Sequence, residues 1–192
     1  SPFVKKKILT LHDVSFYKNK FKLNSKKSLK NIISEKYKIY NLFFFKNQIN
    51  TFITVSEFAK NDIINTLGIK KELIQIIPPI IKKNSILKRN KNKNSILIFL
   101  GDHYQKNSIW SLNNISKWKN FNDYNINLVG ASIKFLKRNI PEFILQKNVI
   151  VNEYIENKLL CELLNKVEIV IIPSLYESFG IPIIESLFYE CL

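Results

Sequence analysis

The stretch Pro173 to Ser186, PSLYESFGIPIIES, decides which fold this sequence favours. It follows a short apolar run, 168–172, that predicts a buried strand. Gly180 allows the backbone to turn tightly, and Pro182 opens an apolar helical pattern at a position where its missing N–H costs nothing. Strand, loop and helix in this order form one unit of an open α/β sheet, in which ligands bind at the loops that follow the strands.

The same alternation continues toward both ends of the chain. Short β-branched runs alternate with helical patterns, which predicts parallel sheets with crossover helices. We expect strands at 8–11, 51–55, 73–77, 96–100, 126–129, 149–151 and 168–172. We expect helices at 29–46, 56–67, 109–121, 158–165 and 182–189.

A polar segment, 82–94, divides the chain into two parts. Its sequence, KKNSILKRNKNKN, contains almost nothing that can pack, so we interpret it as a linker. Residues 1–81 and 95–192 are then predicted to form two facing, doubly wound domains. The sequence has no Met, and an apolar helical pattern is still running at Leu192, so we expect both domains to be incomplete parts of a longer protein.

The chain is strongly basic, with a formal net charge of +15. This charge raises the alternative of a non-catalytic basic module that binds nucleic acid or an anionic membrane. The basic residues are almost all Lys and are spread evenly, whereas phosphate recognition favours Arg, so we expect no nucleic-acid partner. Surface lysines such as Lys5 to Lys7 leave a peripheral contact with an anionic membrane open.

Cysteine usage and hydropathy indicate a cytoplasmic protein. Cys161 and Cys191 show neither the spacing of a metal site nor a disulfide framework, as is typical of a reducing compartment. No apolar run reaches the ~20 residues that a membrane span requires. We therefore expect the protein to be cytoplasmic, and at most peripheral at the inner face of the membrane.

The two acidic residues of PSLYESFGIPIIES, Glu177 and Glu185, are suited to binding a nucleotide-sugar. A helix N-terminus presents N–H groups to a phosphate, and a carboxylate accepts hydrogen bonds from adjacent hydroxyls of a ring. Glu177 and Glu185, on either side of Gly180, would hold a sugar and a ribose that are joined through a diphosphate. The simpler alternative is that both acids are solvated surface residues.

These residues resemble the signature of family-4 glycosyltransferases of the GT-B fold, whose two glutamates are separated by seven residues, as Glu177 and Glu185 are here. Further resemblances follow in the family's order: TLHD at 10–13, FITVSEFAKNDIINTLGI at 52–69, IFLGDHYQKN at 98–107, INLVGA at 126–131 and NVIV at 148–151. The resemblance covers nearly the whole chain. It implies an α/β protein of the GT-B class, with two Rossmann-like domains.

The resemblance also implies roles for single residues. Glu177 would contact the hydroxyls of the donor sugar, and His12, with Asp13 beside it, would reach toward the reacting sugar. Lys106 would neutralise the diphosphate leaving group. These residues are the candidates for the reaction centre.

A second set of residues would hold the donor. Phe179 and Gly180 would offer backbone N–H groups to sugar and diphosphate, and Glu185 would bind the ribose hydroxyls. The remaining donor-binding positions that the resemblance implies are Gly101, Gly130 and Asn152. Asp102 departs from the pattern, since many relatives have Arg there, and Pro79 with the two residues after it replaces the usual Asn-Gly-Val.

The activity implied is that of a metal-independent, retaining hexosyltransferase. It would move a hexose from a UDP- or GDP-linked donor to a hydroxyl of a saccharide or lipid-linked acceptor, in cell-surface polysaccharide synthesis. No cofactor or metal is expected, because a lysine and a helix N-terminus supply the positive charge and the chain has no Asp-x-Asp pair. The alternatives are the basic binding module and an inactive, truncated product that retains the donor half.

Overall fold

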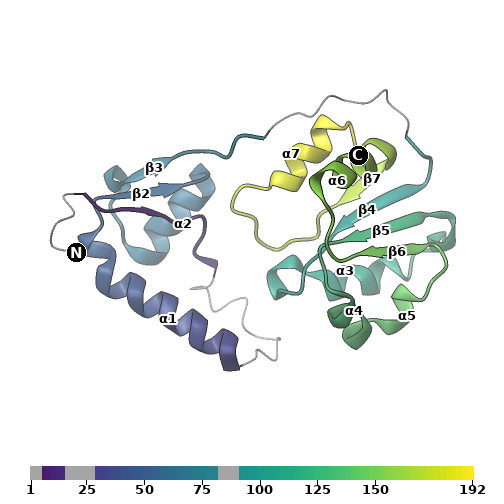
Figure 1. Ribbon diagram of the computed structural model, residues 1–192, viewed down its shortest axis with the longest axis horizontal. Helices are drawn as coiled ribbons and strands as arrows, with labels where there is room; N and C mark the ends of the chain where they lie inside the picture. Colours follow the sequence, from purple (N-terminus) through teal and green to yellow (C-terminus); the bar gives the residue numbers. More distant parts are fainter. Residues whose placement is uncertain (1–5, 16–28, 82–90) are drawn as a thin grey trace. The chain divides into compact units, whose positions relative to one another are not determined.

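The computed structural model describes residues 6–15, 29–81 and 91–192 (Figure 1). The chain forms two compact units, one of residues 1–80 with 177–179 and the other of residues 81–176 with 180–192. Residues 82–90 of the predicted linker and Lys5 of the basic cluster lie outside the described residues. Asn92 and Asn94, at the end of the predicted linker, are bound to the second unit, since their N–H groups donate to Lys166 O (2.7 Å) and to the Glu168 carboxylate (2.9 Å).

The first unit contains a three-stranded parallel sheet in the order β1-β2-β3. Its strands are β1 (Ile8–Thr10), β2 (Thr51–Thr54) and β3 (Ile74–Ile76). Its helices are α1 (Leu29–Phe45) and α2 (Glu57–Leu67), with short 3-10 helices η3 (Lys46–Gln48) and η4 (Lys71–Leu73). A core around Phe52 and Ile63 joins the sheet to α2.

The predicted ends of α2 are confirmed by its capping residues. The hydroxyl of Ser56 accepts a hydrogen bond from the N–H of Ala59 at 3.0 Å, as an N-cap side chain does. Gly68 adopts the left-handed conformation, with φ 64°, and its N–H donates to Ile64 O at 2.9 Å. The sequence therefore determines both ends of this helix through local interactions.

The second unit contains a four-stranded parallel sheet in the order β6-β5-β4-β7. Its strands are β4 (Ser95–Phe99), β5 (Asn125–Val129), β6 (Val149–Asn152) and β7 (Ile169–Ile171). Its helices are α3 (Ser108–Ile115), α4 (Ile133–Asn139), α5 (Pro141–Ile144), α6 (Asn157–Lys166) and α7 (Ile181–Phe188). Short 3-10 helices lie at η5 (Tyr104–Lys106) and η6 (Phe121–Asp123).

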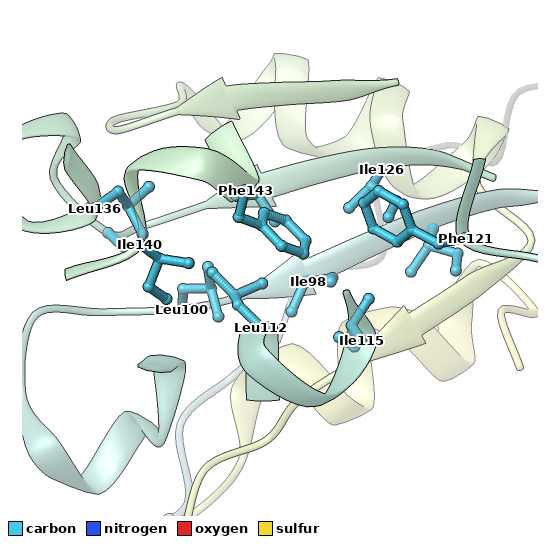
Figure 2. Close-up of a cluster of buried hydrophobic side chains, with 12 residues drawn as sticks. Ile98, Leu100, Leu112, Ile115, Phe121, Ile126, Leu136, Ile140 and Phe143 are labelled. Carbon is cyan, nitrogen blue, oxygen red and sulfur yellow. The ribbon is translucent and has the colours of Figure 1, made fainter. Parts of the chain in front are cut away.

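Helices cover both faces of this second sheet. Ile96 and Ile98 of β4 point into a core that includes Leu112 of α3, Leu136 of α4 and residues of α5 (Figure 2). Leu97, between them in the strand, packs into a separate cluster with residues of α6. Successive side chains of a strand point to opposite faces, so β4 is buried on both sides, as expected for a parallel sheet.

Two features of the second unit differ from the sequence prediction. The helix predicted at 109–121 ends at Ile115, because Asn114 and Ser116 bind nearby carbonyls with their side chains: Asn114 Nδ2 donates to Trp110 O at 2.7 Å and Ser116 Oγ donates to Asn113 O at 3.0 Å. Helices α4 and α5 were not predicted. Both follow β5, the strand that ends directly before the predicted site residue Gly130.

Candidate functional site

The predicted donor-binding residues of the second unit lie at one edge of its sheet. Parallel strands bring their carboxyl ends to the same edge, and Gly101 and Gly130 follow β4 and β5, while Asn152 is the last residue of β6. The loop 172–180 follows β7 at this same edge. The sheet therefore places loops with no sequence proximity next to one another.

Gly101 and Lys106 are in direct contact. A Cβ atom added to Gly101 would lie 2.9 Å from Cγ of Lys106, so only glycine lets the lysine stem pack over the backbone here. Ser108 holds the turn closed, since its hydroxyl accepts from the N–H of Gly101 (3.0 Å) and donates to Gly101 O (2.7 Å). The spacing of Gly101 and Lys106 in the sequence is thus a packing requirement.

The turn that carries Lys106 is joined to the loop of the opening stretch. The N–H of Leu175 donates to Gln105 O at 2.8 Å. Gln105 precedes Lys106 in η5, and Leu175 lies in the loop between β7 and α7. Two segments that are about 70 residues apart in the chain are thereby held side by side, as a phosphate site built from both would need.

Gly130 lies beside Asn152 and against the end of β4. Its N–H donates to Asn152 O at 3.1 Å. It has φ 96°, and a Cβ atom at this position would lie 2.8 Å from the carbonyl oxygen of Leu100. The close approach of two backbones at the carboxyl edge therefore requires glycine.

Asp102 holds the start of α4. Its carboxylate accepts hydrogen bonds from the N–H (2.8 Å) and the hydroxyl (2.7 Å) of Ser132, the N-cap residue of that helix. Ser132 Oγ also accepts from the N–H of Phe135 at 3.2 Å, and the carboxylate of Glu153 accepts from the N–H of Ile133. Asp102 therefore fixes the Gly130 loop to the Gly101 loop, a role that the sequence alone did not reveal.

Gly180 begins the helix that carries Glu185. It is the N-cap of α7, is buried, and has φ 79° and ψ 46°, a left-handed conformation that favours glycine. Ile181 and Pro182 form the first turn, so the positive end of the α7 dipole lies directly after the loop 172–180. The predicted helix of the opening stretch is confirmed.

Glu185 lies half-buried in the second turn of α7. Burial raises the pKa of its carboxyl group above the ordinary value, because the charged form loses hydration. Burial also raises the pKa of Tyr189 to about 12, with contributions from a hydrogen bond to Cys161, the charge of Cys161 and the charge of Glu185. Glu185 and Tyr189 therefore belong to one polar cluster between α6 and α7.

The remaining predicted residues are His12, in the first unit, and Glu177 and Phe179, in the loop 172–180. His12 is exposed and follows β1 in the first unit. Oδ1 of Asp13 accepts two hydrogen bonds from Ser15, one from its N–H (2.9 Å) and one from its hydroxyl (2.7 Å). Glu177 and Phe179 are half-buried in the loop between β7 and α7.

Two buried polar atoms at the carboxyl edge have no hydrogen-bond partner. They are Nδ2 of Asn152 and Oγ of Ser174, and the one other such side-chain atom in the described parts of the chain is Oγ1 of Thr54. Leaving a buried polar group unpaired is costly, so these two atoms are available to a polar ligand at this edge. Ser174 was not among the predicted site residues, although its place shortly after β7 is a signal that sequence reasoning can use.

Within residues 6–15, 29–81 and 91–192, His, Cys, Asp and Glu side chains form no group of three or more that suits a metal ion. Over the same ranges, no helix is long and apolar enough to cross a bilayer. The two cysteines are not joined in a disulfide.

The sequence and structure were compared with known proteins. A family model described as glycosyl transferases group 1 matches residues 80–191. Because the match spans more than half of the chain, the chain belongs to the glycosyl transferases group 1 family. No curated protein matches the sequence significantly.

Several solved structures have a similar fold. A mutant of TarM from S. aureus, in complex with Fondaparinux, alpha-GlcNAc-glycerol and UDP, is 22% identical over 97% of this chain, with a TM-score of 0.68. WaaG, a glycosyltransferase involved in lipopolysaccharide biosynthesis, is 14% identical over 98% of this chain, with a TM-score of 0.65. Sucrose-phosphate synthase from Thermosynechococcus elongatus is 16% identical over 94%, with a TM-score of 0.57.

These likenesses confirm the predicted family and the α/β GT-B fold with its Rossmann-like units. This chain spans 36% of the length of TarM, 56% of WaaG and 47% of the sucrose-phosphate synthase.

Proposed function

We propose that this chain contributes the donor site of a retaining glycosyltransferase, which moves a hexose from a nucleotide-diphosphate-sugar to a hydroxyl of a saccharide or lipid-linked acceptor. The observation that carries the proposal is the contact between the Lys106 turn and the loop of the opening stretch, made by Leu175 and Gln105. It supports a single site in which a lysine and a helix N-terminus bind the same diphosphate. Membership of the glycosyl transferases group 1 family supports the same reaction class.

The diphosphate is the leaving group in this reaction. The bond between the anomeric carbon and the diphosphate oxygen breaks, and negative charge grows on that oxygen. Lys106 and the positive end of α7 stabilise this charge, and interactions that strengthen in the transition state accelerate the reaction. Gly101 and Gly180 let the backbone approach the phosphates closely.

The two acids and the histidine act on the sugars. Glu185 accepts hydrogen bonds from the ribose hydroxyls, and Glu177 accepts them from the donor hexose. His12 assists at the reacting sugar. The acceptor hydroxyl attacks the anomeric carbon on the face from which the nucleotide leaves, so the configuration of the sugar is retained. Its proton passes to the departing diphosphate oxygen as the new glycosidic bond forms.

The remaining donor contacts come from the same edge. Asn152 Nδ2 and Ser174 Oγ, both buried without a partner, supply polar atoms for the donor, and Gly130 and Phe179 line it with backbone. With Lys106 and a helix dipole as its positive groups, the site needs no metal or further cofactor. The donor is UDP- or GDP-linked, and TarM with bound UDP supports the class of ligand.

We also propose that the protein works in cell-surface polysaccharide synthesis, in the cytoplasm at the inner face of the membrane. Participation of WaaG in lipopolysaccharide biosynthesis supports this assignment. Helix α1 adds a physical reason, because it exposes apolar and aromatic side chains beside lysines. Such a surface suits peripheral contact with anionic lipid.

The test is transfer and hydrolysis of a panel of UDP- and GDP-sugars by the chain and by the longest protein that contains it. Lys106→Ala is expected to lower turnover about 10²- to 10³-fold, the usual loss when one stabilising group is removed. Lys117→Ala is the matched control, since it removes the same charge from an exposed position outside the site. Equal turnover by both variants would contradict the proposal, and salt-sensitive nucleic-acid binding without nucleotide-sugar binding would favour the basic module.

A further inference from the structure

A pocket of about 470 Å³ lies in the second unit, away from the candidate donor site. Its walls come from the end of α3, the turn that follows it and α5. These segments precede the amino ends of β5 and β6, whereas the donor-site residues Gly101 and Gly130 follow the carboxyl ends of their strands. The pocket is therefore at the opposite end of the same sheet.

The floor of the pocket is part of the hydrophobic core. Phe121, Ile140 and Phe143 are buried and belong to the cluster drawn in Figure 2. The rings of Phe121 and Phe143 lie 5.4 Å apart between centroids at 64°, an edge-to-face packing that stabilises the floor. The pocket is thus built on rigid structure.

One wall is an exposed aromatic side chain. Trp118 lines the pocket and is 39% exposed. Its ring packs edge-to-face against Tyr124, with 6.2 Å between the centroids and 71° between the planes. Its backbone N–H donates to Ile115 O at 3.1 Å, and its carbonyl oxygen accepts from the N–H of Phe121 at 3.1 Å. A fixed, solvent-facing indole is a platform on which an apolar face can stack.

The other walls are polar but nearly neutral. Asn113, Asn122 and Gln146 contribute amides and Ser116 contributes a hydroxyl, and each of these groups both donates and accepts hydrogen bonds. The side chain of Gln146 is positioned by α5, since its Nε2 donates to Glu142 O at 3.2 Å. The lining contains one acid, Glu142, and one base, Lys119, whose charges offset each other.

From this lining we infer that the pocket is a second binding site, for a neutral oligosaccharide. A sugar ring presents an apolar C–H face, which stacks on an indole, and a rim of hydroxyls, which pair with amides. A phosphate-bearing ligand would call for more positive charge, and a lipid for fewer amides. The volume suits a few sugar units, as pockets of about 300–1,000 Å³ hold small molecules.

The inference does not rest on the proposed transfer activity, because binding can be measured without a donor. A saccharide held here, at the end of the sheet away from the donor edge, would tether a growing chain to the enzyme. Tethering raises the effective concentration of the acceptor without any new contact at the reaction centre.

The fluorescence of Trp118 can report sugar binding in the pocket. The chain has two tryptophans, and Trp110→Phe, at an exposed position outside the pocket lining, leaves Trp118 as the one fluorophore of this kind. We would titrate this variant with maltotetraose and with chitotetraose, and repeat both titrations by calorimetry. The expected result is a saturable change of fluorescence, with a heat of binding, for at least one of the two sugars.

Further variants locate the binding site. Gln146→Ala and Asn122→Ala are each expected to weaken the affinity about tenfold, equivalent to about 1.4 kcal/mol. Gln75→Ala, an exposed residue of β3, is the control and should change nothing. Circular dichroism of each variant checks folding. The inference is overturned if neither sugar binds by either method, or if binding is unchanged in both pocket variants.

Discussion

The binding role proposed for Glu185 and the stability of the fold make opposite demands on its carboxyl group. Its carboxyl group is desolvated, and its pKa is raised for that reason. A raised pKa in the folded state means that ionisation is easier after unfolding, so the charged side chain lowers the free energy of unfolding at neutral pH. A residue kept at such a cost is expected to serve a ligand.

Glu185→Gln is therefore predicted to raise the melting temperature at pH 7 and to weaken nucleotide binding. Below the ordinary pKa of glutamate, the carboxyl is protonated in both states, so the gain should vanish. As pH rises from the ordinary pKa to the raised pKa the gain should grow, and above the raised pKa it should stay constant. Melting curves from pH 3 to 8 test this, with Glu142→Gln, an exposed acid, as the control. A gain independent of pH would contradict the explanation.

Gly130 offers a second prediction for a single residue. Gly130→Ala brings a Cβ atom within 2.8 Å of a backbone oxygen at φ 96°, and neither strand can shift easily. We expect a loss of about 1–3 kcal/mol in the free energy of unfolding, typical of a strained backbone position. Gly68→Ala is the matched control, since it has φ 64° with open space around it. Equal losses in urea denaturation would show that the contact with Leu100 is unimportant.

At the scale of elements, α4 depends on a carboxylate from another loop. Asp102 accepts two hydrogen bonds from Ser132, which in turn caps the helix. We predict that Asp102→Ala and Ser132→Ala each lower the free energy of unfolding by about 1 kcal/mol, the usual value of a helix cap. Because the two residues share a hydrogen bond, the double variant should lose less than the sum. A strictly additive double-mutant cycle would disprove the shared cap, and Asp123→Ala is the surface control.

Elements whose limits are set locally were the ones that sequence predicted well. The strands follow apolar β-branched runs, and α2 carries its own caps in Ser56 and Gly68. Helix α4 was missed because its stabilising acid is 30 residues away, in Asp102. The same reason hides the link between Leu175 and Gln105, so the sequence gives candidate site residues but not how their loops are joined.

At the scale of the whole molecule, a net charge of +15 occurs together with an exposed apolar surface on helix α1. On α1, Ile33, Tyr37, Tyr40 and Phe44 recur at helical spacing and are 54–68% exposed. Leu42, on the opposite side of the helix, is buried in the first unit. Helix α1 thus has one apolar face for the core and another that points away from it.

We predict that the chain binds vesicles containing phosphatidylglycerol and leaves vesicles of phosphatidylcholine unbound. Long-range attraction by the lysines should make this binding fall steeply with salt, while the aromatic face supplies affinity that salt does not screen. Replacing both Tyr37 and Tyr40 by Ser should weaken binding about thirtyfold, since each buried ring contributes on the order of 1 kcal/mol and about 1.4 kcal/mol is tenfold. Tyr154→Ser, at a position that is 87% exposed in the second unit, is the matched control in co-sedimentation. Equal binding by all three proteins would place the membrane contact elsewhere, and equal affinity for both lipids would remove the charge from the explanation.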